Sequence, residues 1–172
     1  MPLEIERRFL LANDSWRAMV LHSAPLKDGI LALDNRRKVR VRIQDEQATL
    51  TIKGPRIGIV RDEFEYEIPL SDARALLARH CSGRIIEKTR HYIFYGEHEW
   101  HIDEFRGLLD GISLAEVELQ TESTPLDVPT WIGREITGIA KYRQSTMIKA
   151  RLRALSKVPA ICAKIDALEK LP

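Results

Sequence analysis

The stretch that decides the fold is residues 3–11, Leu-Glu-Ile-Glu-Arg-Arg-Phe-Leu-Leu. Its charged residues Glu4, Glu6 and Arg8 stand two positions apart, so in a β-strand all three side chains lie on one face. Two carboxylates beside a cation can hold a divalent metal ion and a polyanion together. The same two-residue charge period returns along the chain, which indicates a functional surface rather than one isolated motif.

Length and composition indicate one globular domain over residues 1–172. Hydrophobic residues make up 44% of the chain and charged residues 30%, and the formal net charge is +2. This near balance gives no argument for nucleic-acid binding. Cys81 and Cys162 lie far apart, without the paired spacing of a zinc motif or a disulfide framework. Because the sequence shows no signal-peptide pattern and no membrane-length apolar run, we expect a cytoplasmic protein.

Alternating apolar and polar residues predict a mainly antiparallel β-structure. In residues 37–44, for example, Val39, Val41 and Ile43 alternate with charged residues. Similar patterns that end at turn or proline signals predict further strands. The predicted strands cover residues 3–11, 37–44, 48–53, 59–68, 84–95, 100–105 and 114–120, and an extended segment is expected at 24–33.

Helices are expected at few places. Asn13 and Asp14 are suited to cap one short helix, and Ser71 is suited to cap a second. A Pro-containing connection follows the last predicted strand, and the apolar positions 148, 152 and 155 fit a third helix. We expect residues 156–172 to form a helical extension of the same domain.

The charged faces of the predicted strands suggest a charged interior. If the sheet closes into a barrel, these faces point into one lumen. Carboxylates there would hold Mg²⁺ or Mn²⁺, while arginines and lysines would neutralise phosphate oxygens. The alternative is a half-solvated sheet, because the same alternation is typical of strands with one wet face. The acids are Glu4, Glu6, Glu63, Glu65, Asp103, Glu116 and Glu118, and the bases are Arg8, Arg40, Arg42, Lys53, Arg61, Lys88 and Arg90.

Residues 4–10 resemble the ExExK opening strand of the CYTH proteins, also called triphosphate tunnel metalloenzymes. Further segments resemble the family in the same order along the chain. These are Val-Arg-Val-Arg-Ile at 39–43, Leu-Thr-Ile-Lys-Gly at 50–54, Arg-Asp-Glu-Phe-Glu-Tyr-Glu-Ile-Pro at 61–69, Glu-Lys-Thr-Arg at 87–90, Trp-His-Ile-Asp-Glu-Phe-Arg-Gly at 100–107, Leu-Ala-Glu-Val-Glu-Leu at 114–119, Glu-Ile-Thr at 135–137 and Lys-Tyr-Arg-Gln-Ser at 141–145. One short motif is weak evidence, but many ordered matches are specific.

The resemblance implies a closed tunnel of eight antiparallel strands with flanking helices, through which a triphosphate threads. It implies hydrolysis of inorganic triphosphate with Mg²⁺ or Mn²⁺. The implied metal ligands are Glu4, Glu6, Asp103, Glu116 and Glu118. The implied phosphate ligands are Arg8, Arg40, Arg42, Lys53, Arg61, Lys88 and Arg90. The implied catalytic residues are Glu63, Glu65 and Arg8.

The sequence also departs from the family pattern. Arg8 replaces the lysine of the opening motif and cannot release its proton at working pH. Lys-Asp-Gly-Ile-Leu at 27–31 stands where short members often have Gln-Gly-Tyr-Leu, and Gln144 stands where Asn is more frequent. Alternatives therefore remain: a triphosphate-binding protein with weak or no hydrolysis because of Arg8, a thiamine triphosphatase, or an adenylyl cyclase. A small-molecule substrate, no nucleic-acid or membrane partner, and a possible homodimer complete the expectations.

Overall fold

The computed structural model describes residues 2–81 and 85–155 of the chain. These residues fall into two compact units, 1–138 and 139–172, which we describe separately. In its described residues, the first unit holds nine strands and one α-helix. The strands are β1 (Leu3–Leu11), β2 (His22–Asp34), β3 (Arg37–Gln44), β4 (Gln47–Lys53), β5 (Val60–Glu67), β6 (Ile85–Tyr95), β7 (His98–Arg106), β8 (Ser113–Glu118) and β9 (Ile132–Glu135).

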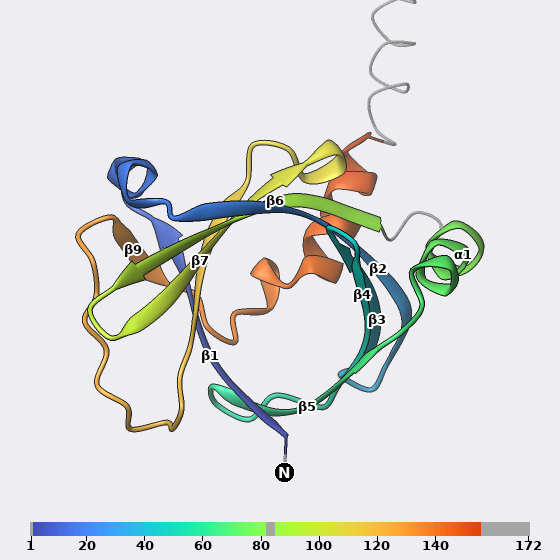
Figure 1. The fold of residues 1–172 in the computed structure, drawn as a ribbon, viewed down its shortest axis with the longest axis horizontal. Coiled ribbons are helices and arrows are strands. Elements are labelled where there is room, and N and C mark those ends of the chain that lie inside the picture. Colours follow the sequence, from blue (N-terminus) through green and yellow to red (C-terminus); the bar gives the residue numbers. More distant parts are fainter. Residues whose placement is uncertain (1, 82–84, 156–172) are drawn as a thin grey trace, which may run out of the picture. The chain divides into compact units, whose positions relative to one another are not determined.

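Eight of these strands close into an antiparallel barrel, which confirms the expectation drawn from the family resemblance (Figure 1). The strand order is β5-β4-β3-β2-β6-β7-β8-β1, and β5 also pairs with β1. At this closing seam Glu4 stands opposite Arg61 and Leu3 opposite Asp62. A backbone hydrogen bond from the Glu6 amide to the Ile59 carbonyl continues the seam. Closure leaves these eight strands without an unpaired edge around a common interior.

Tight turns between the strands set their register. Asn35 and Arg36 both have positive φ in the β2–β3 connection, as a two-residue hairpin turn with the twist of the flanking strands requires. β6 and β7 are joined through Gly96, whose φ is +61°. Because register is fixed at these hairpins, a two-residue period in sequence becomes a row of side chains on one face of the barrel wall.

The sequence does not predict β9. This short strand pairs with the end of β1, where Phe9 stands opposite Glu135. It lies within the stretch that we expected to be only a connection, and four residues are too few to show an alternation. The Arg7 guanidinium donates to both carboxylate oxygens of Glu135, at 3.0 and 2.6 Å, on the outer side of the barrel.

The helix α1 (Leu70–His80) packs on the outer face of the barrel wall (Figure 1). Its Ala73 and Leu77 form an apolar cluster with Val41, Ala48 and Cys81. The predicted Ser71 cap is wrong: the N-cap residue is Pro69, two positions earlier, and it makes no side-chain capping hydrogen bond. The β2 backbone lies directly against side chains of the helix and its C-cap, since a Cβ on Gly29 would lie 2.5 Å from the Leu77 Cδ2 and 2.6 Å from the Cys81 Sγ.

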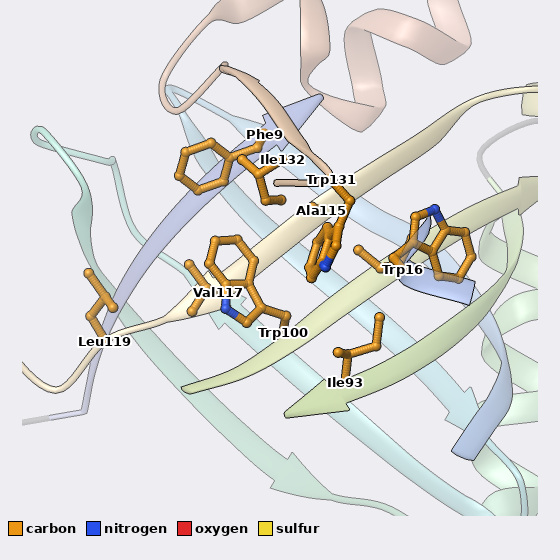
Figure 2. Close-up of a cluster of buried hydrophobic side chains, with 10 residues drawn as sticks. Phe9, Trp16, Ile93, Trp100, Ala115, Val117, Leu119, Trp131 and Ile132 are labelled. Atoms are coloured by element: carbon orange, nitrogen blue, oxygen red, sulfur yellow. The ribbon is translucent and has the colours of Figure 1, made fainter. Parts of the chain in front are cut away.

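A second apolar cluster covers another part of the outer wall. It is built on three buried tryptophans, and Figure 2 shows Trp100 and Trp131 among smaller apolar side chains. The rings of Trp100 and Trp131 pack edge to face with their centroids 5.5 Å apart, and the ring centroids of Phe9 and Trp100 are 5.6 Å apart. Trp16 joins the cluster from the 3₁₀ helix Ser15–Met19. At the start of this helix, the Asn13 side-chain oxygen accepts a hydrogen bond from the Ser15 backbone amide. These two clusters lie outside the wall, whereas the register places charged side chains on the inner face together with a few buried apolar ones, Leu26, Ile30 and Phe105.

In the second unit, a 3₁₀ turn at Ala140–Tyr142 precedes a helical stretch at 144–155. This agrees with the helix expected around positions 148–155. The expected extension at 156–172 lies outside the described residues. In the described part of the chain, no helix has both the length and the apolar character needed to cross a membrane.

Candidate active site in the barrel lumen

Strand register places the predicted charged residues on the inner face of the barrel. Arg8 stands opposite Glu116, Lys53 opposite Glu63, and Arg90 opposite Asp103. Cross-strand neighbours of this kind share a face. Several of these charged side chains are also buried: Glu4, Glu6, Arg40, Lys53, Lys88, Arg90 and Asp103. The alternative of a half-solvated sheet is therefore wrong for these positions, because side chains on a solvent-facing sheet surface would be exposed, and these are buried.

Glu4 forms the centre of a cation cluster at the closing seam. Its Oε1 accepts a hydrogen bond from Lys53 Nζ at 2.7 Å, and its Oε2 accepts from Arg56 at 3.0 Å and from Arg61. Burial acts to raise the pKa of Glu4, but the hydrogen bond from Arg61 and the charge of Lys53 hold it well below its usual range. Glu4 therefore stays ionised.

Glu6 has weaker cation partners than Glu4. Arg56 Nη2 lies 3.3 Å and Arg8 Nε 3.7 Å from its Oε1. Burial, together with the nearby carboxylates of Glu116 and Glu4, raises the pKa of Glu6 to about 7. Carboxylates crowd here in a buried space, which costs free energy when all of them are ionised.

A second charge cluster surrounds Asp103, which is completely buried. Arg90 donates to both of its oxygens, at 2.7 and 2.8 Å, and Lys88 donates to Oδ2. Arg90 also donates to Glu116 at 2.8 Å, and Arg8 lies 2.8 Å from the other Glu116 oxygen. Burial lowers the pKa of Lys88 to about 8, although Asp103 opposes the shift.

The two predicted catalytic carboxylates lie on β5. Glu63 accepts a hydrogen bond from Lys53, and burial together with the neighbouring Glu4 raises its pKa. Glu65 accepts from the Thr51 hydroxyl at 2.7 Å and from Arg40 at 3.3 Å. Of the two, Glu63 is the more enclosed, with a side chain 18% exposed against 45% for Glu65.

The structure adds lumen residues that sequence reasoning missed. Asp28 on β2 accepts two hydrogen bonds from Arg42, at 2.6 and 2.9 Å. Arg56, in the loop before β5, bridges Glu4 and Glu6. Lys38 stands opposite Lys53, and burial together with the charge of Arg40 lowers its pKa well below the usual value. Only the register of β2 and β3 could have revealed Asp28, and no periodic signal marks Arg56.

The donor set has the chemistry of a Mg²⁺ or Mn²⁺ site. Carboxylate oxygens are the ligands that such hard cations prefer, and a divalent cation would relieve the crowding around Glu6. Among residues 2–81 and 85–155, however, no three Asp, Glu, His or Cys side chains are arranged so that they could bind a metal ion together. Arginines and lysines pair with several of these carboxylates, including Glu4, Glu6 and Glu116. Glu118 stands opposite Glu6 in register but is exposed.

Comparison with known proteins agrees with this geometry. An inorganic triphosphatase from Acetivibrio thermocellus is 36% identical over 149 residues, which cover 87% of this chain and 95% of the relative. The crystal structure of an inorganic triphosphatase called NE1496 matches with a TM-score of 0.60 at 29% identity, covering 86% of this chain and 95% of that one.

More distant structures share the fold alone. The PH1012 protein from Pyrococcus horikoshii matches with a TM-score of 0.55 at 14% identity, over 69% of this chain and 79% of that one. The family model of the CYTH domain matches residues 2–166, which is nearly the whole sequence. The closed eight-stranded barrel, the ordered motifs and these matches agree, and the chain belongs to the CYTH domain family.

Proposed function

We propose that this protein hydrolyses inorganic triphosphate inside its barrel, with the help of a divalent metal ion. The observation that carries the proposal is that cations and carboxylates from β1, and from each strand between β3 and β8, share one closed inner face. Two relatives that match most of this chain are named inorganic triphosphatases, which supports a hydrolase and this substrate.

The basic side chains would bind the phosphates. A triphosphate carries several negative charges, and the burial of Arg40, Lys53, Lys88 and Arg90 strengthens their attraction to it. The proposed phosphate ligands are Arg8, Arg40, Arg42, Lys53, Arg61, Lys88 and Arg90. Guanidinium groups bind phosphate oxygens through two parallel hydrogen bonds, which fixes the orientation as well as the charge of the substrate.

The carboxylates of Glu4, Glu6 and Glu116 would hold the metal ion, with Asp103 and Glu118 as further candidates. A bound Mg²⁺ or Mn²⁺ supplies positive charge that stabilises the charge developing on the transferred phosphoryl group. Ionised Glu4 is suited to this role, because its pKa lies far below neutral pH.

Glu63 is the better placed of the two candidates for accepting the proton of the attacking water. Burial and the charge of Glu4 raise its pKa, and a more basic carboxylate is a better proton acceptor. Lys53 holds its carboxylate in a defined orientation. Glu65 would instead keep Arg40 and Thr51 in place, since both donate to its Oε2.

One observation favours the second candidate, a protein that binds triphosphate with little or no hydrolysis. Arg8 lies in the lumen against Glu116, and this carboxylate raises the pKa of the already basic guanidinium despite its burial. Arg8 therefore serves as a fixed charge and not as a proton donor or acceptor. If the chemistry needs a proton from this position, the protein binds without turning over.

Phosphate release decides between these candidates. The purified protein is incubated with tripolyphosphate, thiamine triphosphate or ATP, each with Mg²⁺ or Mn²⁺, and phosphate and cyclic AMP are measured. We expect phosphate from tripolyphosphate and none when the metal is chelated. Binding without product would favour the second candidate, and preference for another compound would reassign the substrate.

The structure holds a single chain, so a homodimer stays a prediction.

A further inference from the structure

Asp28 is a buried carboxylate inside the phosphate-binding wall, by which we mean the part of the lumen that carries Arg40, Arg42 and Lys88. It is 1% exposed and lies on β2, opposite Arg42 on β3. Arg42 uses its Nε and Nη2 atoms to donate to the two Asp28 oxygens, at 2.6 and 2.9 Å. The outer face of the neighbouring residue, Gly29, is covered by α1, which fixes the backbone behind the carboxylate.

Asp28 serves more than one cation. Arg40 Nη1 and Lys88 Nζ each lie 3.9 Å from its Oδ2. These three cations repel one another: burial lowers the pKa values of both Arg40 and Lys88, and the charge of Arg42 lowers them further. Burial acts to raise the pKa of Asp28, but Arg42 and Arg40 hold it well below its usual range, so the carboxylate remains charged.

A triphosphate bound in the lumen would offer negative charge to the same three cations. In the empty barrel, the Asp28 carboxylate neutralises these clustered positive charges at a buried position. In the occupied barrel, the substrate would supply negative charge to the same cations. Opposite charges attract strongly at such sites, and the carboxylate and the substrate, both anions, repel each other.

We propose that Asp28 is an internal counterion of the phosphate-binding wall, which stabilises the empty barrel and weakens its affinity for polyanions. The inference rests on the proposed function, because it takes the lumen as the triphosphate site. It goes further in assigning a residue that sets affinity without serving as a phosphate ligand. Weaker binding also favours release of anionic products.

Isothermal calorimetry with tripolyphosphate, in EDTA to prevent metal-dependent hydrolysis, tests this role on wild type and on Asp28→Asn. The amide keeps the shape of the side chain and removes its charge. We expect the Kd of Asp28→Asn to fall by about tenfold or more. We also expect its Kd to depend more steeply on salt concentration, because the wall carries more net positive charge.

Glu87→Gln is the matched control. Glu87 lies on β6 beside Lys88 in sequence, but it pairs with Lys27 on the outer face at 2.8 Å with both side chains about half exposed. This variant loses the same charge outside the lumen, and its Kd should equal that of wild type. Asp28→Glu, which restores the charge, should return the Kd toward the wild-type value.

The opposite result overturns the inference. If Asp28 only positions Arg42, the Asn variant binds tripolyphosphate more weakly, and an unchanged Kd also rules out the counterion role. Should Asp28→Asn be unfolded alone, we expect tripolyphosphate to restore its circular dichroism spectrum, and failure to do so at concentrations that saturate wild type overturns the inference. Absence of binding to wild type and variant alike would instead remove the proposed function together with this inference.

Discussion

The Glu4 carboxylate accepts a hydrogen bond from the Lys53 ammonium at 2.7 Å, although the two residues are 49 positions apart. Glu4 lies on β1 and Lys53 on β4, and these strands are separated by β5 in the closed barrel. The two side chains are only 6% and 5% exposed. This pair spans the seam at which the barrel closes, so the same contact serves both the fold and the proposed site.

Replacing Lys53 with Gln should destabilise the barrel. Glu4 would keep Arg56 and Arg61, but Glu63 would lose its hydrogen bond from Lys53. Loss of one partner from a buried ionic group costs roughly 1–3 kcal/mol of unfolding free energy. Urea unfolding measures the change.

Lys27→Gln serves as the control for this variant, because Lys27 belongs to an exposed pair with Glu87. We expect it to change the unfolding free energy by at most about 0.5 kcal/mol. Equal effects of the two substitutions would show that the seam contact adds nothing to stability.

Arg42→Gln should weaken tripolyphosphate binding and raise KM by about tenfold or more, because one charged bidentate ligand is lost. Steady-state phosphate release at varied tripolyphosphate concentration measures KM and kcat. The control is Arg37→Gln, since Arg37 lies on the same strand but is exposed. An equal KM for both variants would place the phosphates away from β3.

Strand alternation predicted which charged side chains share one face, because in a barrel a period of two separates inner from outer side chains. Arg40 and Glu63 were found in this way, and both lie on the inner face. The charge pattern alone could not separate a lumen from a wet surface. That distinction needed closure of β1 on β5, which is a contact between distant parts of the chain.

Two of the missed residues lacked a periodic signal, whereas Lys38 had one, since it lies two positions before Arg40 on the same strand. Asp28 lies between Lys27 and Gly29, in a strand whose alternation was too irregular to assign faces. Arg56 belongs to a loop, and its two carbonyl partners, those of Glu6 and Ile59, are brought together only by the seam. β9 is too short for a pattern and is held by pairing with β1.

Arg8→Lys tests whether the departure from the family motif limits turnover. Lysine keeps one charge but can exchange a proton, and it lacks the guanidinium fork that contacts Glu116. If wild type binds tripolyphosphate without product, we expect Arg8→Lys to gain phosphate release. If wild type already turns over, kcat should change by less than about tenfold. A wild type that turns over and a lysine variant that does not would make the guanidinium essential.

Stability at acidic pH should depend on Asp28. Its pKa in the folded barrel lies well below the ordinary value of 3.8, so its stabilising contribution is complete above that value. As pH falls below 3.8, the unfolded chain binds the proton before the folded barrel does. The contribution therefore decreases and is lost once the pH has passed through the lowered pKa. Urea unfolding between about pH 5 and about pH 3 should show a smaller loss for Asp28→Asn than for wild type. Parallel curves would contradict the assigned charge state.

Phosphate release from tripolyphosphate by wild type and by Glu6→Gln, with Mg²⁺ or Mn²⁺, tests the central claim most directly. Glu6 is buried among Glu4 and Glu116, and the amide removes one proposed metal-binding carboxylate while it keeps the side-chain shape. We predict metal-dependent release by wild type that falls to background in the folded Glu6→Gln variant. Release that persists in this variant, or the absence of both binding and release in folded wild type across metals and pH, would contradict a triphosphate site in the barrel.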